Sequence, residues 1–209
     1  MSGKRMLLAA FCLVAMCGVQ AAERLWTGGG DAVRWSDPAN WGGTAPSAGD
    51  SVRFENTSGA RISTSNDIPG LSLSQIWCVG TSPVALSGET LTLTGAHVWS
   101  NAVETTCSIP FHVNPAGSTK MTFGAIAQFN ADVVSYGTTG TFQLTGPSHP
   151  AFYGHLLSTN QNLLCYMNNG AAHFYAPVHV KGIESTGYIY GSLRFHTTNN
   201  VVGTVAPVL

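Results

Sequence analysis

The sequence predicts an all-β protein, a right-handed β-solenoid (β-helix) with a tryptophan-rich cap at its N-terminal end. Charged residues make up only 9% of the 209-residue chain, against roughly 25% in typical soluble domains. Aromatic residues reach 10%, which is more than disordered chains usually carry. Short segments of alternating apolar and polar residues recur along the chain between turn-forming residues, as expected for strands with one buried face.

The first element has the features of a signal peptide. The basic residues 4–5 precede an almost wholly apolar run over residues 6–19. This run of about 14 residues has the length of a signal core and is too short to span a bilayer comfortably. Residues 19–21, Val-Gln-Ala, then fit the small-x-small pattern of a cleavage site. We predict export with cleavage after Ala21 or, as the alternative, after Ala22.

Two other interpretations of this segment fit the sequence less well. A buried core helix also suits an apolar run, but it does not explain the order of charge, run and cleavage site. Cys17 follows residues 14–16, Val-Ala-Met, which faintly resembles a lipoprotein box. Such a box needs a small residue before the cysteine, and Met16 is large, so a lipid anchor is disfavoured.

The mature chain is weakly charged and slightly acidic. Removal of residues 1–21 takes two of the nine basic residues and leaves seven against ten acidic ones, a balance of −3. Such a chain has no electrostatic footprint for nucleic acid. It also contains no basic amphipathic helix for a membrane surface. We therefore predict no nucleic-acid partner and no integral membrane segment in the mature chain.

Residues 22–67 form the predicted cap. They hold three of the five tryptophans, Trp26, Trp35 and Trp41, among dense Pro and Gly residues that indicate ordered turns. Trp35 and Trp41 lie on either side of the turn-forming pair 37–38, and Asn40 is able to cap a turn through its side-chain amide. A packed cap is favoured. The alternative is that Trp26, Trp35 and Trp41 stack on sugar rings as a glycan-binding platform.

Residues 68–209 form the predicted strand-repeat region. The interval from Leu91 to Phe111 is nearly the same as that from Phe123 to Leu144, and the segment 91–95 is echoed by the segment 142–146. Such intervals suit stacked coils of roughly 20 to 25 residues. A β-sandwich also needs several short alternating strands and is the alternative. The chain stops in what reads as the middle of a repeat, so we predict that this region is incomplete at its C-terminal end.

The sequence offers no recognisable catalytic, metal or cofactor site. The acidic residues beyond the cap are scattered, although stacking would still allow Glu104 and Asp132 to align if they lay one or two coils apart. The seven histidines form no His-Glu-x-x-His pair. A bond between Cys78 and Cys107 and buried free thiols both remain open. We therefore predict no catalytic residue, no metal and no cofactor.

Residues 25–54 carry the most specific pattern in the chain. It reads Leu-Trp-Thr-Gly-Gly-Gly-Asp over 25–31, Trp-Ser-Asp-Pro-Ala-Asn-Trp over 35–41 and Pro-Ser-Ala-Gly-Asp-Ser-Val-Arg-Phe over 46–54. The pattern resembles the start of large bacterial surface proteins that carry autotransporter-associated β-strand repeats. This resemblance implies export, a β-helical passenger-like stalk and a role at the cell surface.

These observations predict an exported, non-enzymatic β-solenoid, secreted or at the bacterial cell surface, with a structural or adhesive role. Its expected partners are surface glycans or other extracellular polymers. Two alternatives remain open at this stage. One is a polysaccharide-degrading β-helix enzyme, which requires acidic and basic side chains gathered in one groove. The other is a glycan-binding β-sandwich, which requires exposed tryptophan rings.

Overall fold

The chain folds into a parallel β-solenoid of about six turns, in which half of the residues are in strands and 2% are helical. The computed structural model describes residues 21–185, 192–196 and 201–207. Among these residues every pairing between strands is parallel, and the predicted solenoid is confirmed. The alternative β-sandwich is wrong, because a sandwich needs antiparallel pairs.

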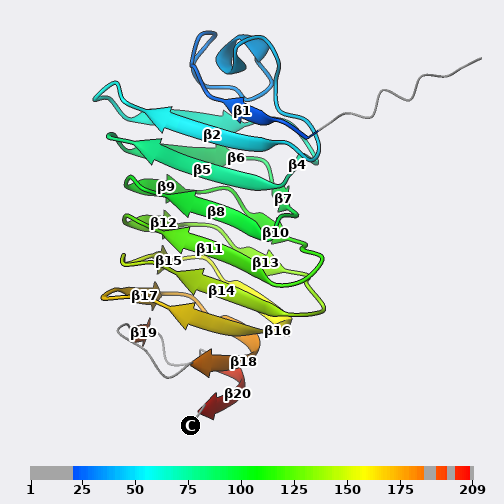
Figure 1. The fold of residues 1–209 in the computed structure, drawn as a ribbon, viewed down its shortest axis with the longest axis vertical. Helices are drawn as coiled ribbons and strands as arrows, with labels where there is room; N and C mark the ends of the chain where they lie inside the picture. The colour runs from blue at the N-terminus through cyan, green and yellow to red at the C-terminus, as the bar shows by residue number, and fades with distance from the viewer. Residues whose placement is uncertain (1–20, 186–191, 197–200, 208–209) are drawn as a thin grey trace, which may run out of the picture.

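Each coil contributes one strand to each of three faces, and the coils follow one another from the top to the bottom of Figure 1. The first-face strands are β2 (Ser51–Asn56), β5 (Gln75–Gly80), β8 (His97–Asn101), β11 (Thr119–Phe123) and β14 (Thr141–Thr145). The second-face strands are β3 (Ile62–Asn66), β6 (Val84–Gly88), β9 (Thr105–Cys107), β12 (Ala127–Phe129), β15 (Ala151–Phe152), β17 (Ala171–Phe174) and β19 (Ser192–Phe195).

The third face joins the first face in the lower part of the molecule. Its short strands are β4 (Ser72–Leu73), β7 (Leu91–Leu93), β10 (Phe111–Val113) and β13 (Val133–Ser135). Three longer strands then run from the third face of one coil into the first face of the next: β16 (Leu156–Tyr166), β18 (Val178–Ser185) and β20 (Val201–Pro207). The described strands therefore form a 13-stranded sheet over these two faces and a separate 7-stranded sheet on the second face.

Neighbouring coils are offset by a nearly constant length of chain. Near the top of the first face Val52 pairs with Ile76. Further down the same face Leu163 pairs with Ile183, at a slightly shorter offset. Both offsets agree with the predicted coil of roughly 20 to 25 residues. Because the strands are parallel, each backbone hydrogen bond between coils joins residues about one coil apart in sequence.

The intervals read from the sequence matched this register only in part. Leu91 pairs with Phe111, as their spacing predicted. Leu144, in contrast, pairs with Met121 instead of Phe123. The similar segments 91–95 and 142–146 lie on different faces, in β7 and β14. They resemble each other because in both an inward leucine is followed by a threonine and then by a glycine at the turn.

The core is a continuous apolar column inside the coils. In β11 the side chains of Thr119, Met121 and Phe123 are buried, whereas the two residues between them are only partly buried. The other short strands repeat this alternation, because successive side chains of a strand point to opposite faces. On the second face Phe129, Phe152 and Phe174 stack one above another, with ring centroids 4.9 and 5.2 Å apart. The apolar residues of the alternating segments thus fill the interior.

The N-terminal segment sits on the first coil and pairs with all three of its faces. Strand β1 (Glu23–Leu25) lies parallel to β2. On the second face the amide of Trp35 donates to the carbonyl of Ser65, at 3.0 Å, and on the third the amide of Gly49 donates to the carbonyl of Ser72, at 2.9 Å. The predicted cap of residues 22–67 thus includes part of the first coil, because residues 51–66 already contain β2 and β3.

The three cysteines among the described residues are buried free thiols. Cys78, Cys107 and Cys165 are unbonded, which settles the alternative left open by the sequence. Burial raises the pKa of Cys107 and of Cys165 to about 12. These thiols therefore stay protonated and serve as small apolar core residues.

No helix among the described residues is both long and apolar enough to cross a bilayer. The described helical segment is the single 3-10 turn η1 (Pro38–Trp41) of the cap.

Candidate functional site

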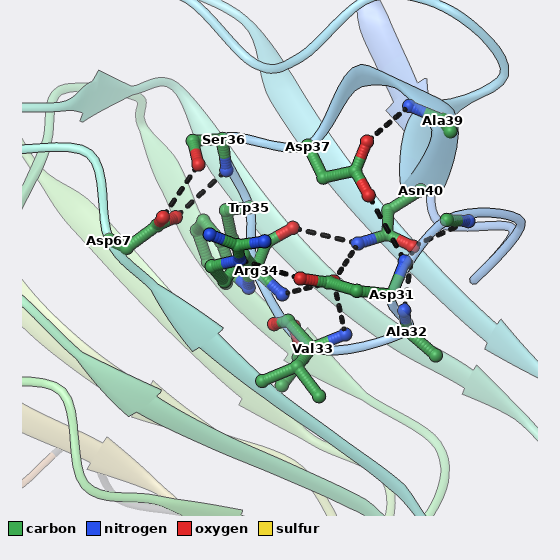
Figure 2. A network of polar contacts seen from close by, with 12 residues as sticks. Asp31, Ala32, Val33, Arg34, Trp35, Ser36, Asp37, Ala39, Asn40 and Asp67 are labelled. Carbon is green, nitrogen blue, oxygen red and sulfur yellow. Dashed lines mark hydrogen bonds and ion pairs between the residues drawn. The ribbon is translucent and has the colours of Figure 1, made fainter.

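Asn40 organises the polar half of the cap. Its side chain is fully buried. The amide oxygen accepts hydrogen bonds from the backbone N–H groups of Gly30, at 2.9 Å, and Ala32, at 3.0 Å. The amide nitrogen donates to Oδ1 of Asp31 and to the carbonyl of Arg34, both at 2.8 Å. The prediction that Asn40 caps a turn is confirmed, and Figure 2 shows how the loop folds around this one amide.

Three carboxylates, those of Asp31, Asp37 and Asp67, complete the network in Figure 2. Oδ1 of Asp37 accepts from the N–H of Ala39 and begins η1. Asp67 binds the N–H and hydroxyl of Ser36, at 2.8 and 2.6 Å, and so ties the cap to the end of β3. Asp31 forms an ion pair with Arg34, at 2.6 Å. The hydrogen bond from the Arg34 side chain, with backbone donors, lowers the pKa of Asp31 well below its usual range.

The apolar half of the cap is a cage of three tryptophans around Phe54. Trp41 meets Trp26 and Trp35 edge-to-face, with ring centroids 4.9 and 5.8 Å apart. Its indole N–H donates to the carbonyl of Trp35 at 2.8 Å. All three rings also contact Phe54 of β2 at 5.6 to 5.7 Å. The cap is therefore attached to the first coil by aromatic packing.

This burial leaves no free ring face for the glycan-stacking role considered for Trp26, Trp35 and Trp41. Their exposed fractions are 6%, 0% and 5%. Trp26 lines a hollow of about 460 Å³ together with Thr27 and Arg61, but it contributes little more than an edge. The flanking turn residues fold the rings inward, as the packed-cap interpretation predicted.

The solvent-facing feature with the most regular side-chain geometry is a column of rings beside the second face. Tyr153, Tyr175 and His196 stack nearly parallel, with centroids 4.6 and 4.2 Å apart and interplanar angles of 8° and 6°. His173 stacks on His196 at 5.3 Å and contacts His149 at 5.9 Å. We call these five residues the ring column.

The interior phenylalanines set the spacing of the ring column. Tyr153, Tyr175 and His196 each directly follow a stacked residue, namely Phe152, Phe174 and Phe195. Their backbone N–H groups donate to the carbonyls of Phe129, Phe152 and Phe174 of the preceding coil, at 2.8, 2.8 and 2.9 Å. Neighbouring residues of a strand point to opposite sides. The residues that follow the stacked phenylalanines are therefore aligned on the outside of the coil, and because each of them carries a ring, they form a second stack there.

Electrostatics in the ring column favours the neutral form of His173. Partial burial lowers the pKa of His173, and the neighbouring His196, Arg194 and His149 lower it further. Nδ1 of His173 lies 3.1 Å from Nε2 of His196, so the N–H of one ring donates a hydrogen bond to the other ring in this contact. That hydrogen bond requires at least one unprotonated nitrogen and is lost when both rings are charged.

Sequence analysis missed the ring column. The signal is present as the dipeptides Phe152-Tyr153, Phe174-Tyr175 and Phe195-His196, which recur at intervals of one coil. The alternating segments identify strands one at a time. The ring stack becomes recognisable only when the outward residue after each phenylalanine is aligned with the corresponding residues of the neighbouring coils.

The carboxylates of Glu104 and Asp132 do not come together. Glu104 pairs with Arg61 at 3.6 Å, and Asp132 pairs with His155 at 3.0 Å. Glu104 precedes β9 on the second face and Asp132 precedes β13 on the third, so stacking does not align them. In the described part of the chain, no three His, Cys, Asp or Glu side chains are placed to hold a metal ion. The side chain of Glu184 lies outside the described residues.

The fold and the ring column define this chain as a β-solenoid with an ordered aromatic–imidazole surface. Comparison of the chain with protein-family models, with curated proteins and with solved structures found no match.

Proposed function

We propose that this chain is an exported, non-enzymatic β-solenoid that acts at the cell surface or in secreted form, in a structural or adhesive role. The observation that carries the proposal is the ring column on the outside of a rigid parallel stack. The Trp and Gly pattern of residues 25–54 adds the resemblance to autotransporter passengers with β-strand repeats. The expected partners are extracellular polymers, surface glycans among them.

The geometry of the ring column suits adhesion to an extended polymer. Its rings stack on one another, so their edges, hydroxyls and imidazole nitrogens face outward at intervals of one coil. Tyrosine presents a large contact area with few rotatable bonds and is enriched in protein interfaces. A partner that binds such a preorganised row immobilises few protein side chains, which lowers the entropic cost of association.

A location experiment tests export and assembly. An antibody raised against residues 23–209 is applied to fractionated producing cells. A band much larger than 21.9 kDa in the outer membrane supports a passenger, whereas a band slightly below that mass in the medium or periplasm supports a stand-alone exported domain. A product confined to the cytoplasm contradicts the proposal.

A binding experiment tests the adhesive role. The exported chain and its Tyr153→Ser/Tyr175→Ser variant are compared for retention on surfaces coated with cell-surface polysaccharides. We expect the variant to lose about tenfold in affinity, equivalent to roughly 1.4 kcal/mol. Tyr166→Ser is the matched control, because Tyr166 is also exposed but lies outside the ring column. Equal retention of all three proteins would contradict a role for the ring column.

A further inference from the structure

A buried carboxylate lies beside the predicted cleavage site. The side chain of Asp50, directly before β2, is fully buried. Its Oδ2 atom accepts from Nε of Arg24 at 2.9 Å and from the N–H and hydroxyl of Ser47, both at 3.0 Å. Its Oδ1 atom accepts from the backbone nitrogen of Ala22 at 2.7 Å. Burial raises the pKa of Asp50, but these donors outweigh burial and hold the pKa below its ordinary value.

The nitrogen of Ala22 is held in place from its C-terminal side. The carbonyl of Ala22 accepts from the N–H of Ser51 at 2.9 Å. Strand β1 begins at the next residue, where Glu23 pairs with Ser51. Ala21 is exposed, so the chain crosses from solvent into the fold at the bond between Ala21 and Ala22. Hydrolysis of this bond leaves every contact of Ala22 in place.

We infer that Asp50 is the receptor for the α-amino group that export creates on Ala22. Hydrolysis adds water across the amide bond, leaves a carboxylate on Ala21 and leaves an amine on Ala22, which takes up a proton. A neutral N–H donor thereby becomes an ammonium group at the same position. The inference rests on the proposed export, and it selects cleavage after Ala21 over cleavage after Ala22.

The chemistry of the site favours the charged terminus. Asp50 lies in a setting that keeps it ionised, so a positive charge on the amine of Ala22 adds Coulomb attraction to the hydrogen bond that is already present. Cleavage after Ala22 would remove Ala22, whose backbone nitrogen donates to Oδ1 of Asp50, and would leave that oxygen without this donor. A buried carboxylate oxygen without a partner is costly. A mature chain that begins with Ala22 therefore keeps both oxygens of Asp50 paired, whereas a chain that begins with Glu23 does not.

The first test is the mass of the native exported chain. We expect its N-terminal residue to be Ala22. An exported chain that begins with Glu23 overturns this inference and leaves the proposed export intact. An uncleaved chain kept inside the producing cells overturns both.

The second test measures the reactivity of the new amine. The exported chain is acylated at pH 7 with an amine-reactive ester, and modification of Ala22 is followed by mass spectrometry. Pairing with Asp50 raises the pKa of the amine, and one pKa unit lowers the reactive free-base fraction about tenfold. We expect at least this protection relative to Asp50→Asn. Ser47→Ala, which removes one neutral donor to Oδ2 and keeps the ion pair, should remain protected.

A comparison within the wild-type chain covers the case in which Asp50→Asn does not fold. The Ala22 amine should react about tenfold faster in concentrated urea than in the folded chain, because unfolding separates it from Asp50. Equal rates in the folded and unfolded states would overturn the inference. They would not affect the proposed export, which the N-terminal mass tests separately.

Discussion

Asn40 illustrates how a single side chain determines the shape of the cap. It binds both ends of the loop over 30–34, through two acceptor and two donor contacts. A carboxylate or a hydroxyl in its place lacks part of this combined capacity. Asp31 and Asp37 each close a local turn and Asp67 ties the cap to the end of β3, whereas Asn40 fixes the loop as a whole.

We expect Asn40→Ala to lower the free energy of unfolding by about 2 kcal/mol, because buried polar groups lose their partners. Urea denaturation monitored by tryptophan fluorescence measures the change. Ser36→Ala is the control, since it removes one exposed hydrogen bond, to Asp67, and should cost well under about 1 kcal/mol. Equal losses in the two variants would show that Asn40 has no special role.

The ring column predicts a loss of stability in acid. Since the folded pKa of His173 lies below that of the unfolded side chain, about 6.5, the unfolded chain binds the proton first as the pH falls. The contribution of His173 is therefore fully present above about pH 6.5 and is lost below it.

The variant His196→Gln removes one of the neighbours that disfavour charge on His173. We expect the pKa of His173 to rise toward its ordinary value and the melting temperature to fall less between pH 7 and pH 5. NMR titration of the imidazole and thermal unfolding measure the two effects. His97→Gln, an exposed histidine of β8, should change neither. A pKa of His173 that is the same in both variants would contradict the assigned cause.

Glycines allow the coils to stack closely at the ends of strands. A Cβ atom on Gly154 would lie 2.2 Å from the backbone of Ala131, and one on Gly170 would lie 2.0 Å from the carbonyl oxygen of Ser148. In both cases the obstructing backbone belongs to the preceding coil. Gly154 and Gly170 therefore lie where the backbones of neighbouring coils are in close contact.

We expect Gly154→Ala to lower the free energy of unfolding by about 3 kcal/mol, because backbone cannot move aside as a flexible side chain can. This corresponds to a drop in melting temperature of roughly 6–12 °C. Gly117→Ala is the matched control, since a Cβ there meets nothing within 4 Å. It should leave stability unchanged or raise it by up to about 1 kcal/mol. Similar destabilisation in both variants would contradict the stacking argument.

The elements were more predictable from sequence than their arrangement. The alternating segments 91–95 and 142–146 do contain strands, β7 and β14, because the period of two depends only on local residues. Their partners depend on register, which short stretches of sequence do not fix; hence Leu144 was aligned with Phe123 although it pairs with Met121. The tryptophan cage was predictable because Trp35 and Trp41 flank one turn. The ring column was not, since its members come from separate coils.

At the scale of the whole molecule, the N-terminal cap protects the open end of the stack. The first coil would otherwise expose unpaired backbone groups on β2, β3 and β4, and such edges promote association between chains. The cap contributes β1 on one face and backbone hydrogen bonds on the other two. Figure 1 shows it lying across the end of the solenoid. Its tryptophan cage attaches this cover to the core.

We expect Trp41→Ala to reduce the free energy of unfolding by about 4 kcal/mol, through lost packing in the cage. It should also increase concentration-dependent self-association, because a loosened cap exposes the strand edges. Thermal unfolding and analytical ultracentrifugation measure the two effects. Trp41→Phe keeps an aromatic ring and loses the hydrogen bond to Trp35, so it should be destabilised by only about 1–2 kcal/mol. Unchanged sedimentation of Trp41→Ala would contradict the protective role of the cap.

The near-constant offset between coils also determines how the molecule responds to mechanical force. Backbone hydrogen bonds between coils point along the solenoid axis, so a pull on the two ends loads them in tension, one coil boundary after another. A coil that detaches releases its own length of chain, on the order of 80 Å when extended, while the coils behind it keep their contacts. Under load the protein would lengthen in discrete steps and dissipate energy at each one. A tether with this property yields gradually under shear and does not fail in a single event.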